Sequence, residues 1–99
     1  MKYSVAEIAE LIKKNESELR QFWVLELYLF GSVARGQATD QSDVDFYVVL
    51  DERGADLFNL ISLNQFLEDL LKTKVDLGTK KSLRKSIRDQ VFQEAVRVA

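Results

Sequence analysis

The spacing of apolar residues along the chain predicts three helices. The first covers residues 4–20, with Ser4 as its N-cap and an apolar stripe formed by Val5, Ile8, Leu11, Ile12 and Leu19. The second covers residues 55–71, where the apolar positions are Leu57, Leu60, Ile61, Leu67, Leu70 and Leu71. The third covers residues 82–96, with a stripe formed by Leu83, Ile87, Val91, Ala95 and, just beyond it, Val98. Each helix has one apolar face, so we expect all three to pack against a common core.

Shorter apolar runs predict strands. Val24–Phe30 alternates so that its core face carries Leu25, Leu27 and Leu29. Val44–Leu50 has one fully apolar face, formed by Val44, Phe46, Val48 and Leu50. A third run covers residues 74–77, and the second helix makes a crossover that could bring it beside Val44–Leu50. The pattern therefore predicts an α/β (α+β) fold, a small mixed sheet covered by helices, as one domain over residues 1–99.

Composition excludes several kinds of chemistry. The chain has no cysteine, so it forms neither a disulfide nor a thiolate zinc site, and a reducing cytoplasm is its expected setting. It has no histidine, which excludes a Ser-His-Asp triad and leaves a carboxylate as the expected general base. Its net charge of -2 argues against general nucleic-acid binding. No apolar run is long enough to span a membrane, so we expect no membrane association.

The segment between the first two strands contains candidate phosphate-binding residues. Residues 31–45 read GSVARGQATDQSDVD, and the glycine and serine fall where the first strand ends. A short helical turn is expected at residues 33–35. A backbone that leaves a strand through glycine and enters a helix exposes unpaired N–H groups, which favour a phosphate anion. Gly31, the Ser32 hydroxyl and the fixed cation of Arg35 are therefore candidate nucleotide-binding residues.

Two aspartates follow at alternating positions. Asp43 stands at the entrance of the second strand and Asp45 lies two residues further on, so both carboxylates share one face. Two ionised carboxylates this close repel each other, and a cation or a shared proton relieves the repulsion. Mg2+ prefers oxygen ligands and commonly binds one or two carboxylates together with substrate phosphates. Asp76, inside the third strand, is the candidate for a third carboxylate.

Structural roles explain some of these residues equally well. A Gly-Ser pair after a strand is often only a turn, and Asp43 could simply begin its strand by bonding the turn backbone. Asp45 and Asp76 are harder to explain in this way, because each opposes the β-propensity of the apolar residues around it. Two such exceptions beside one phosphate-binding turn favour a functional site.

The combined motif resembles the nucleotidyltransferase superfamily related to DNA polymerase beta, and within it the minimal nucleotidyltransferases. The resemblance extends from about Val24 to Leu77, and the ARG segment sharpens it toward the minimal subgroup. It implies a polymerase-beta-like catalytic core in which Gly31 and Ser32 hold the nucleoside triphosphate. It also implies that Asp43 and Asp45 hold the metal ions and that Asp76 binds a second metal and acts on the attacking hydroxyl.

The resemblance implies a magnesium-dependent transfer of AMP from ATP to a hydroxyl acceptor. Members of this subgroup are often encoded beside a HEPN-domain ribonuclease, so the implied role is an antitoxin that adds AMP to a tyrosine of that toxin. Two other readings stay open. The chain could be a catalytically silent antitoxin that acts by occlusion, or the catalytic subunit of a two-chain transferase for RNA or a small molecule. Assembly with itself or with another chain is compatible with each reading.

Overall fold

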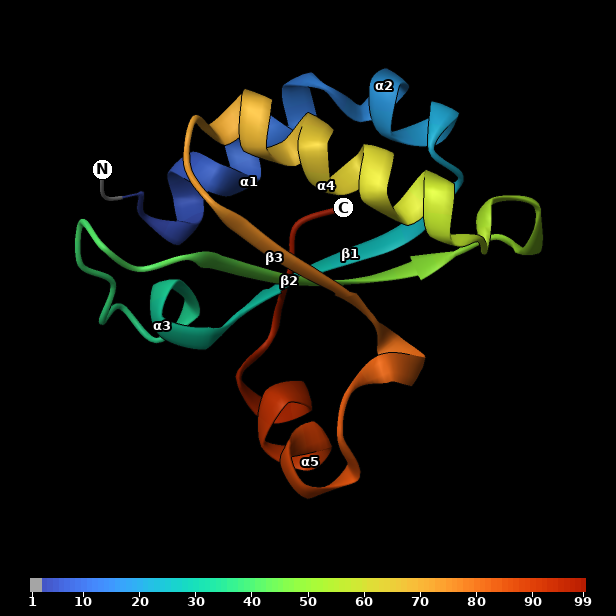
Figure 1. Cartoon of the computed structure of the whole chain (residues 1–99). Helices are drawn as coiled ribbons and strands as arrows, with labels where there is room; N and C mark the ends of the chain where they lie inside the picture. Colours follow the sequence, from blue (N-terminus) through green and yellow to red (C-terminus); the bar gives the residue numbers. More distant parts are fainter. Residues whose placement is uncertain (1–2) are drawn as a thin grey trace.

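The computed structural model describes residues 3–99 and contains a four-stranded mixed sheet in the order β3-β2-β1-β4, with helices on both faces (Figure 1). The central strand β1 (Val24–Phe30) is antiparallel to β2 (Val44–Leu50) and to β4 (Val96–Arg97). Strand β3 (Val75–Thr79) is parallel to β2. The predicted α/β class is confirmed, and three of the strands lie where the apolar runs predict them.

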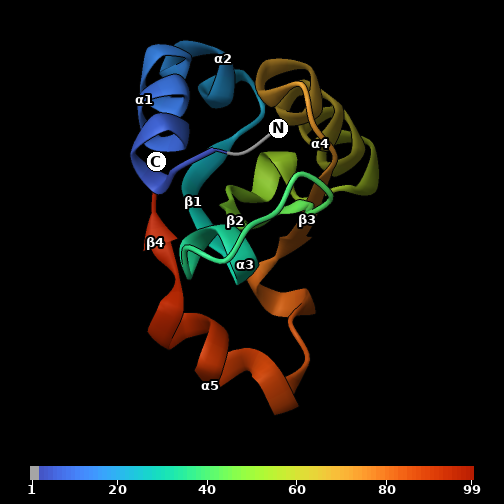
Figure 2. The same ribbon diagram turned by 90° about the vertical axis from the view of Figure 1, so that its left-hand side faces the viewer.

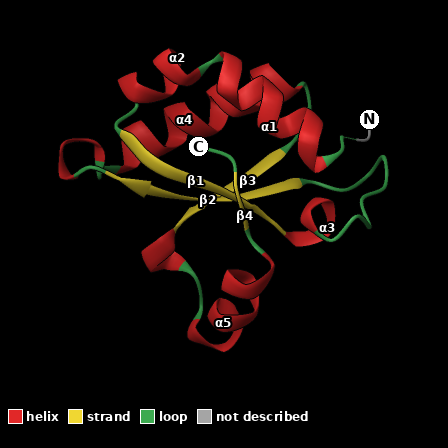
Figure 3. Cartoon of the chain, turned by 180° about the vertical axis from the view of Figure 1, so that it is seen from behind, coloured by secondary structure: helices red, strands yellow, loops and turns green. Residues whose placement is uncertain are grey.

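Helices α1 (Val5–Lys14), α2 (Glu16–Gln21) and α4 (Leu57–Leu71) cover one face of the sheet, as the view from behind shows clearly (Figure 3). The core lies between these helices and the sheet. Its fully buried side chains are Ile8, Ile12, Leu27, Leu29, Phe46, Val48, Leu63, Leu67 and Leu71. Burial of this many large apolar side chains is the main favourable term that holds a domain of this size together.

The first predicted helix is two helices in the structure. Ser4 caps α1 as expected, through a capping box with Glu7. The prediction of one continuous helix over residues 4–20 is wrong because Asn15 ends α1 and stands at the N-cap position of α2. The Asn15 amide donates to the Leu11 carbonyl oxygen at 2.8 Å, a local bond that competes with the regular helix.

The second predicted helix begins two residues later than expected. Asp56 is the N-cap of α4 and accepts from the Asn59 N–H at 2.8 Å, after a short 3-10 turn at Glu52–Gly54. Leu57 and Ile61 were expected on the core face, but they are 68% and 57% exposed. Leu63, which the apolar stripe had omitted, is fully buried instead. The core stripe of α4 therefore runs through Leu63, Leu67 and Leu71.

One expected core position on β1 is also wrong. Leu27 and Leu29 are fully buried, but Leu25 is 55% exposed. The register between β1 and β2 shifts between Val24 and Glu26, so that simple alternation fails at Leu25. The result is a shorter apolar face on β1 than the sequence suggests.

The third predicted helix is shorter than expected, and its last residue, Val96, begins a strand. A 3-10 turn at Lys80–Ser82 precedes α5 (Lys85–Glu94), and the chain then turns back along β1 as β4, as the side view shows (Figure 2). The prediction of a helix over residues 82–96 is therefore wrong at both ends. Only Val91 of the predicted stripe is buried within α5, while Ile87 is exposed. Backbone pairing of β4 with β1 takes the place of the last helical turn.

Candidate active site

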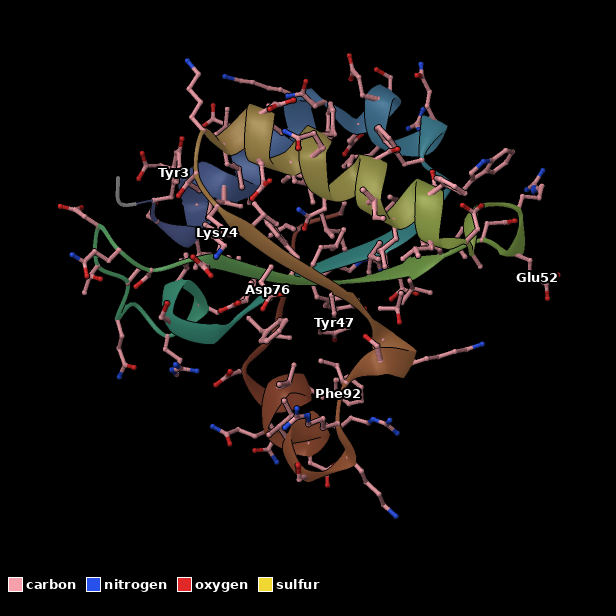
Figure 4. All side chains as sticks on the ribbon, viewed as in Figure 1. Tyr3, Tyr47, Glu52, Lys74, Asp76 and Phe92 are labelled. Carbon is pink, nitrogen blue, oxygen red and sulfur yellow. The ribbon has the colours of Figure 1, made fainter. Side chains whose placement is uncertain are left out.

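The face of the sheet opposite the main core carries the predicted carboxylates. Asp45 on β2 and Asp76 on β3 are direct neighbours in the parallel register, so their side chains project to the same face. Asp43 lies just before β2 and is half-buried, while Asp76 is exposed on the edge strand (Figure 4). Within residues 3–99, none of the three carboxylates has a hydrogen-bond or ion-pair partner. The fold therefore brings together charges that the sequence separates.

Burial and neighbouring negative charges act together on Asp45. Burial, followed by the negative charges of Asp76 and Asp43, raises the pKa of the Asp45 carboxyl from 3.8 to about 6. Arg35 acts in the opposite direction, and Glu94 adds a smaller contribution that raises the pKa further. A positive ion placed between these carboxylates would relieve the repulsion, so the site has the electrostatics of a cation-binding site.

Gly31 brings the turn that is predicted to bind phosphate against Asp45. The helix α3 (Gly31–Ala34) begins directly after β1, so the helical turn predicted at residues 33–35 starts two residues earlier in the structure. Gly31 has a φ of 78°, a left-handed conformation that favours glycine. A Cβ atom at this position would overlap the Asp45 carboxylate. Glycine is therefore required at residue 31 both by its backbone conformation and by the close approach of Asp45.

Arg35 and Ser32 lie on the same turn. The Arg35 backbone N–H donates to the Gly31 carbonyl oxygen at 3.1 Å, which closes α3. The guanidinium donates from Nη1 to Glu94 Oε1 at 3.0 Å and from Nε to Gln37 Oε1 at 3.1 Å. The Ser32 side chain is partly exposed and forms no hydrogen bond with the described residues. The turn thus presents a hydroxyl and a cation beside the aspartates.

Glu94 is a site residue that the sequence analysis missed. It is the last residue of α5, and its Oε1 also accepts from the Gly31 N–H at 3.4 Å. A glutamate on a polar helix face gives no sequence signal for such a contact, because Arg35 and Glu94 are far apart in the chain. The only available hint was that the third helix begins a few residues after Asp76.

Aromatic side chains hold α5 over this face. Tyr28 and Tyr47 stack across β1 and β2 with ring centroids 4.6 Å apart. Phe92 of α5 lies 5.6 Å from the Tyr47 ring, and the two side chains point toward one another in Figure 4. Burial raises the pKa of the Tyr47 hydroxyl, and a hydrogen bond to Glu26 raises that of Tyr28. Both phenols therefore stay neutral near pH 7.

The donor set fits a hard divalent ion in its chemistry. The candidate ligands are carboxylate oxygens only, which suits Mg2+ and excludes metals that require sulfur or imidazole. In the part of the chain that the structure describes, no group of three or more acidic side chains is close enough to enclose a metal ion. Mg2+ is commonly held by one or two carboxylates and completed by substrate phosphates.

A cavity with a largely apolar lining lies away from the aspartates. It has a volume of about 510 Å³ and lies at the opposite end of β2, between the start of α4 and the end of β3. Leu57 and Leu60 line it on one side, and Lys80 and Lys81 on the other. It shares no residue with the acidic site.

Fold and site together define the class of protein. The chain matches the nucleotidyltransferase domain family over residues 10–98, so it belongs to this family and is a nucleotidyltransferase enzyme. It is 40% identical to the protein adenylyltransferase MntA of Thermococcus cleftensis over 96 residues, which cover 96% of each chain. These findings confirm the resemblance to the minimal nucleotidyltransferases. No helix within residues 3–99 is long and apolar enough to cross a membrane.

Solved structures support the same assignment. A minimal nucleotidyltransferase is 34% identical with a TM-score of 0.73, and the match covers 90% of this chain and 93% of that one. A toxin-antitoxin structure with AMP-PNP is 27% identical with a TM-score of 0.73, over 92% of this chain and 72% of that one. The chain is therefore similar both to a minimal nucleotidyltransferase and to a chain of a toxin-antitoxin structure.

Proposed function

We propose that this enzyme transfers AMP from ATP to a hydroxyl group on a partner protein. The observation that carries the proposal is the adjacency of Asp45 and Asp76 on one face of the sheet, with the Gly31 turn packed against Asp45. The relative that is named a protein adenylyltransferase supports the choice of AMP and of a protein acceptor. The similar structure that contains AMP-PNP supports an adenine nucleotide.

The turn residues are assigned to the outer phosphates. The Gly31 N–H, the Ser32 hydroxyl and the Arg35 guanidinium all lie on the turn that follows β1. Charge-assisted hydrogen bonds from such donors to phosphate oxygens are stronger than neutral ones and fix the orientation of the anion. These residues would thereby hold the β- and γ-phosphates and direct the α-phosphate toward the aspartates.

The carboxylates are assigned to metal binding and to the acceptor. Asp43 and Asp45 would hold Mg2+, with Asp76 beside them, and the bound ion would neutralise charge on the triphosphate. Asp76, the most exposed of the three, would also accept the proton of the attacking hydroxyl. The hydroxyl oxygen forms a bond to the α-phosphorus while the bond to the bridging oxygen breaks. Pyrophosphate then leaves with that electron pair.

The acceptor is assigned to another protein because the similar MntA of Thermococcus cleftensis is named a protein adenylyltransferase. The resemblance to the antitoxins of HEPN/MNT pairs suggests a HEPN-domain toxin as the partner and a tyrosine hydroxyl as the acceptor. The similarity to a toxin-antitoxin structure supports a partner of this kind.

The test uses ATP labelled at the α-phosphate. The purified enzyme is incubated with Mg2+, labelled ATP and lysate of its source, in parallel with Asp45→Asn and with Asp89→Asn. Asp89 is an exposed carboxylate on α5, so its substitution changes the net charge by the same amount. We expect label on one protein band with the wild type and Asp89→Asn, and none with Asp45→Asn, whose circular dichroism spectrum should stay native.

The other outcomes separate the competing functions. Label retained by Asp45→Asn would contradict the site assignment. Label in RNA or in a small molecule would support nucleotidyl transfer by this site but contradict a protein acceptor. Intact ATP and no label in any fraction would favour an antitoxin that acts by occlusion alone.

A further inference from the structure

The carboxylate of Glu94 occupies the phosphate-binding turn. A single oxygen, Glu94 Oε1, accepts from the Gly31 N–H at 3.4 Å and from Arg35 Nη1 at 3.0 Å. The Glu94 side chain is only 18% exposed, whereas that of Arg35 is 41% exposed. An anion supplied by the chain itself is therefore bound by two of the groups that are assigned to the outer phosphates of the nucleotide.

A phosphate oxygen and a carboxylate oxygen require the same donors. Both accept from a backbone N–H and from a guanidinium, and both gain from the positive charge. The two anions cannot use the same donors at once, and three aspartates already make the surroundings negative. Binding of a triphosphate at the turn consequently requires that Glu94 withdraw.

We propose that Glu94 is an intramolecular competitor that limits how tightly the enzyme binds the outer phosphates of its nucleotide. This inference rests on the proposed function, because it takes Gly31 and Arg35 as phosphate-binding residues. In the nucleotide-free enzyme the Glu94 carboxylate keeps Arg35 folded against the turn. In the nucleotide complex the triphosphate replaces that carboxylate, so Glu94 sets nucleotide affinity without contacting the reacting atoms.

Because α5 is anchored, replacing the Glu94 carboxylate with a triphosphate requires only the Glu94 side chain to move. Val91 is buried, Phe92 packs on Tyr47, and β4 pairs with β1 directly after the helix. Because the helix is held at these points, the Glu94 side chain can rotate away from the turn while α5 stays in place. The competitor is thus the side chain and not the whole C-terminal segment.

The test compares nucleotide affinities in Glu94→Gln and Glu94→Ala with the wild type. Isothermal titration calorimetry with AMP-PNP and Mg2+ should give a dissociation constant about threefold to tenfold lower in both variants, as expected for loss of a half-exposed ion pair. AMP lacks the outer phosphates and should bind equally well to all three proteins. Asp89→Asn is the matched control for net charge and should bind AMP-PNP as the wild type does.

The outcomes distinguish this inference from the proposed function. If the wild type binds AMP-PNP and the Glu94 variants bind it equally or more weakly, the inference is overturned and the proposed function stands. If the Glu94 variants also bind AMP more tightly to the same degree, or if Asp89→Asn binds AMP-PNP more tightly than the wild type, the effect is one of general charge. Either result would also overturn the inference. If neither the wild type nor any variant binds AMP-PNP, the inference and the proposed function both fail.

Discussion

The two faces of the sheet differ in almost every physical respect. The face under α1, α2 and α4 is apolar, and the largest fully buried side chains lie there. The opposite face carries Asp45, Asp76 and the stacked pair of Tyr28 and Tyr47, and it is covered by α5 (Figure 1). One apolar face is sufficient to hold a small sheet and its helices together. The second face is then available for charges that would be costly in a core.

The largest expected difference in stability is between Phe46→Ala and Asp76→Ala. Phe46 is fully buried on the apolar face, so Phe46→Ala should lower the free energy of unfolding by about 3–5 kcal/mol. Asp76 is exposed on the other face, so Asp76→Ala should change it by no more than about 0.5 kcal/mol. Urea unfolding followed by circular dichroism measures both. Similar losses for the two variants would mean that the sheet depends on both faces.

The next contrast is between two glycines. Gly31 and Gly36 both have positive φ, 78° and 71°, but a Cβ would overlap the Asp45 carboxylate only at Gly31 and would meet nothing within 4 Å at Gly36. We expect Gly36→Ala to lower the free energy of unfolding by about 1 kcal/mol through backbone strain. Gly31→Ala should lower it by about 1–2 kcal/mol more. Thermal unfolding of the pair tests this difference. Equal losses would show that Asp45 moves aside at no cost.

The smallest effect concerns the pH dependence of Asp45. Its pKa is raised to about 6 in the folded protein, so the folded state binds this proton more tightly than the unfolded state does. This carboxyl therefore destabilises the fold fully above pH 6 and not at all below its unfolded pKa of 3.8. The shift corresponds to about 3 kcal/mol for a fully buried group, and solvent screening of this half-buried one reduces it to about 1 kcal/mol.

Removal of the Asp45 charge tests this linkage. Asp45→Asn should raise the free energy of unfolding by about 1 kcal/mol at pH 7.5, and the gain should disappear near pH 4. Melting temperatures of both proteins across this range, in the absence of divalent ions, provide the measurement. A gain in the free energy of unfolding that is constant with pH would mean that the pKa of Asp45 is not raised in the folded protein.

The apolar face could be predicted from the sequence better than the functional face. Alternation in β2 gave the core positions Phe46 and Val48, because a strand with one apolar side has a single favourable register. The same alternation placed Asp45 and Asp76 opposite that core, and their adjacency followed from the α4 crossover. These predictions rest on local pattern and on simple topology, and the structure agrees with both.

The rest depends on contacts that local patterns do not encode. The break at Asn15 arises from a side-chain bond to the backbone, and the exposure of Leu25 from a shift in register. Strand β4 has two residues and exists only because β1 offers it an edge. The contact of Arg35 with Glu94 joins residues that are 59 positions apart in the sequence. Tertiary structure decides each of these features.

The two open edges of the sheet also differ from its centre. An exposed edge strand offers unpaired backbone groups on which another molecule can build a further strand, and proteins guard against this with very short or charged edges. One edge here is β4, which is only two residues long, and the other is β3, which displays the exposed Asp76. Both edges therefore carry a feature that disfavours further strand pairing, because β4 is very short and β3 bears an exposed carboxylate.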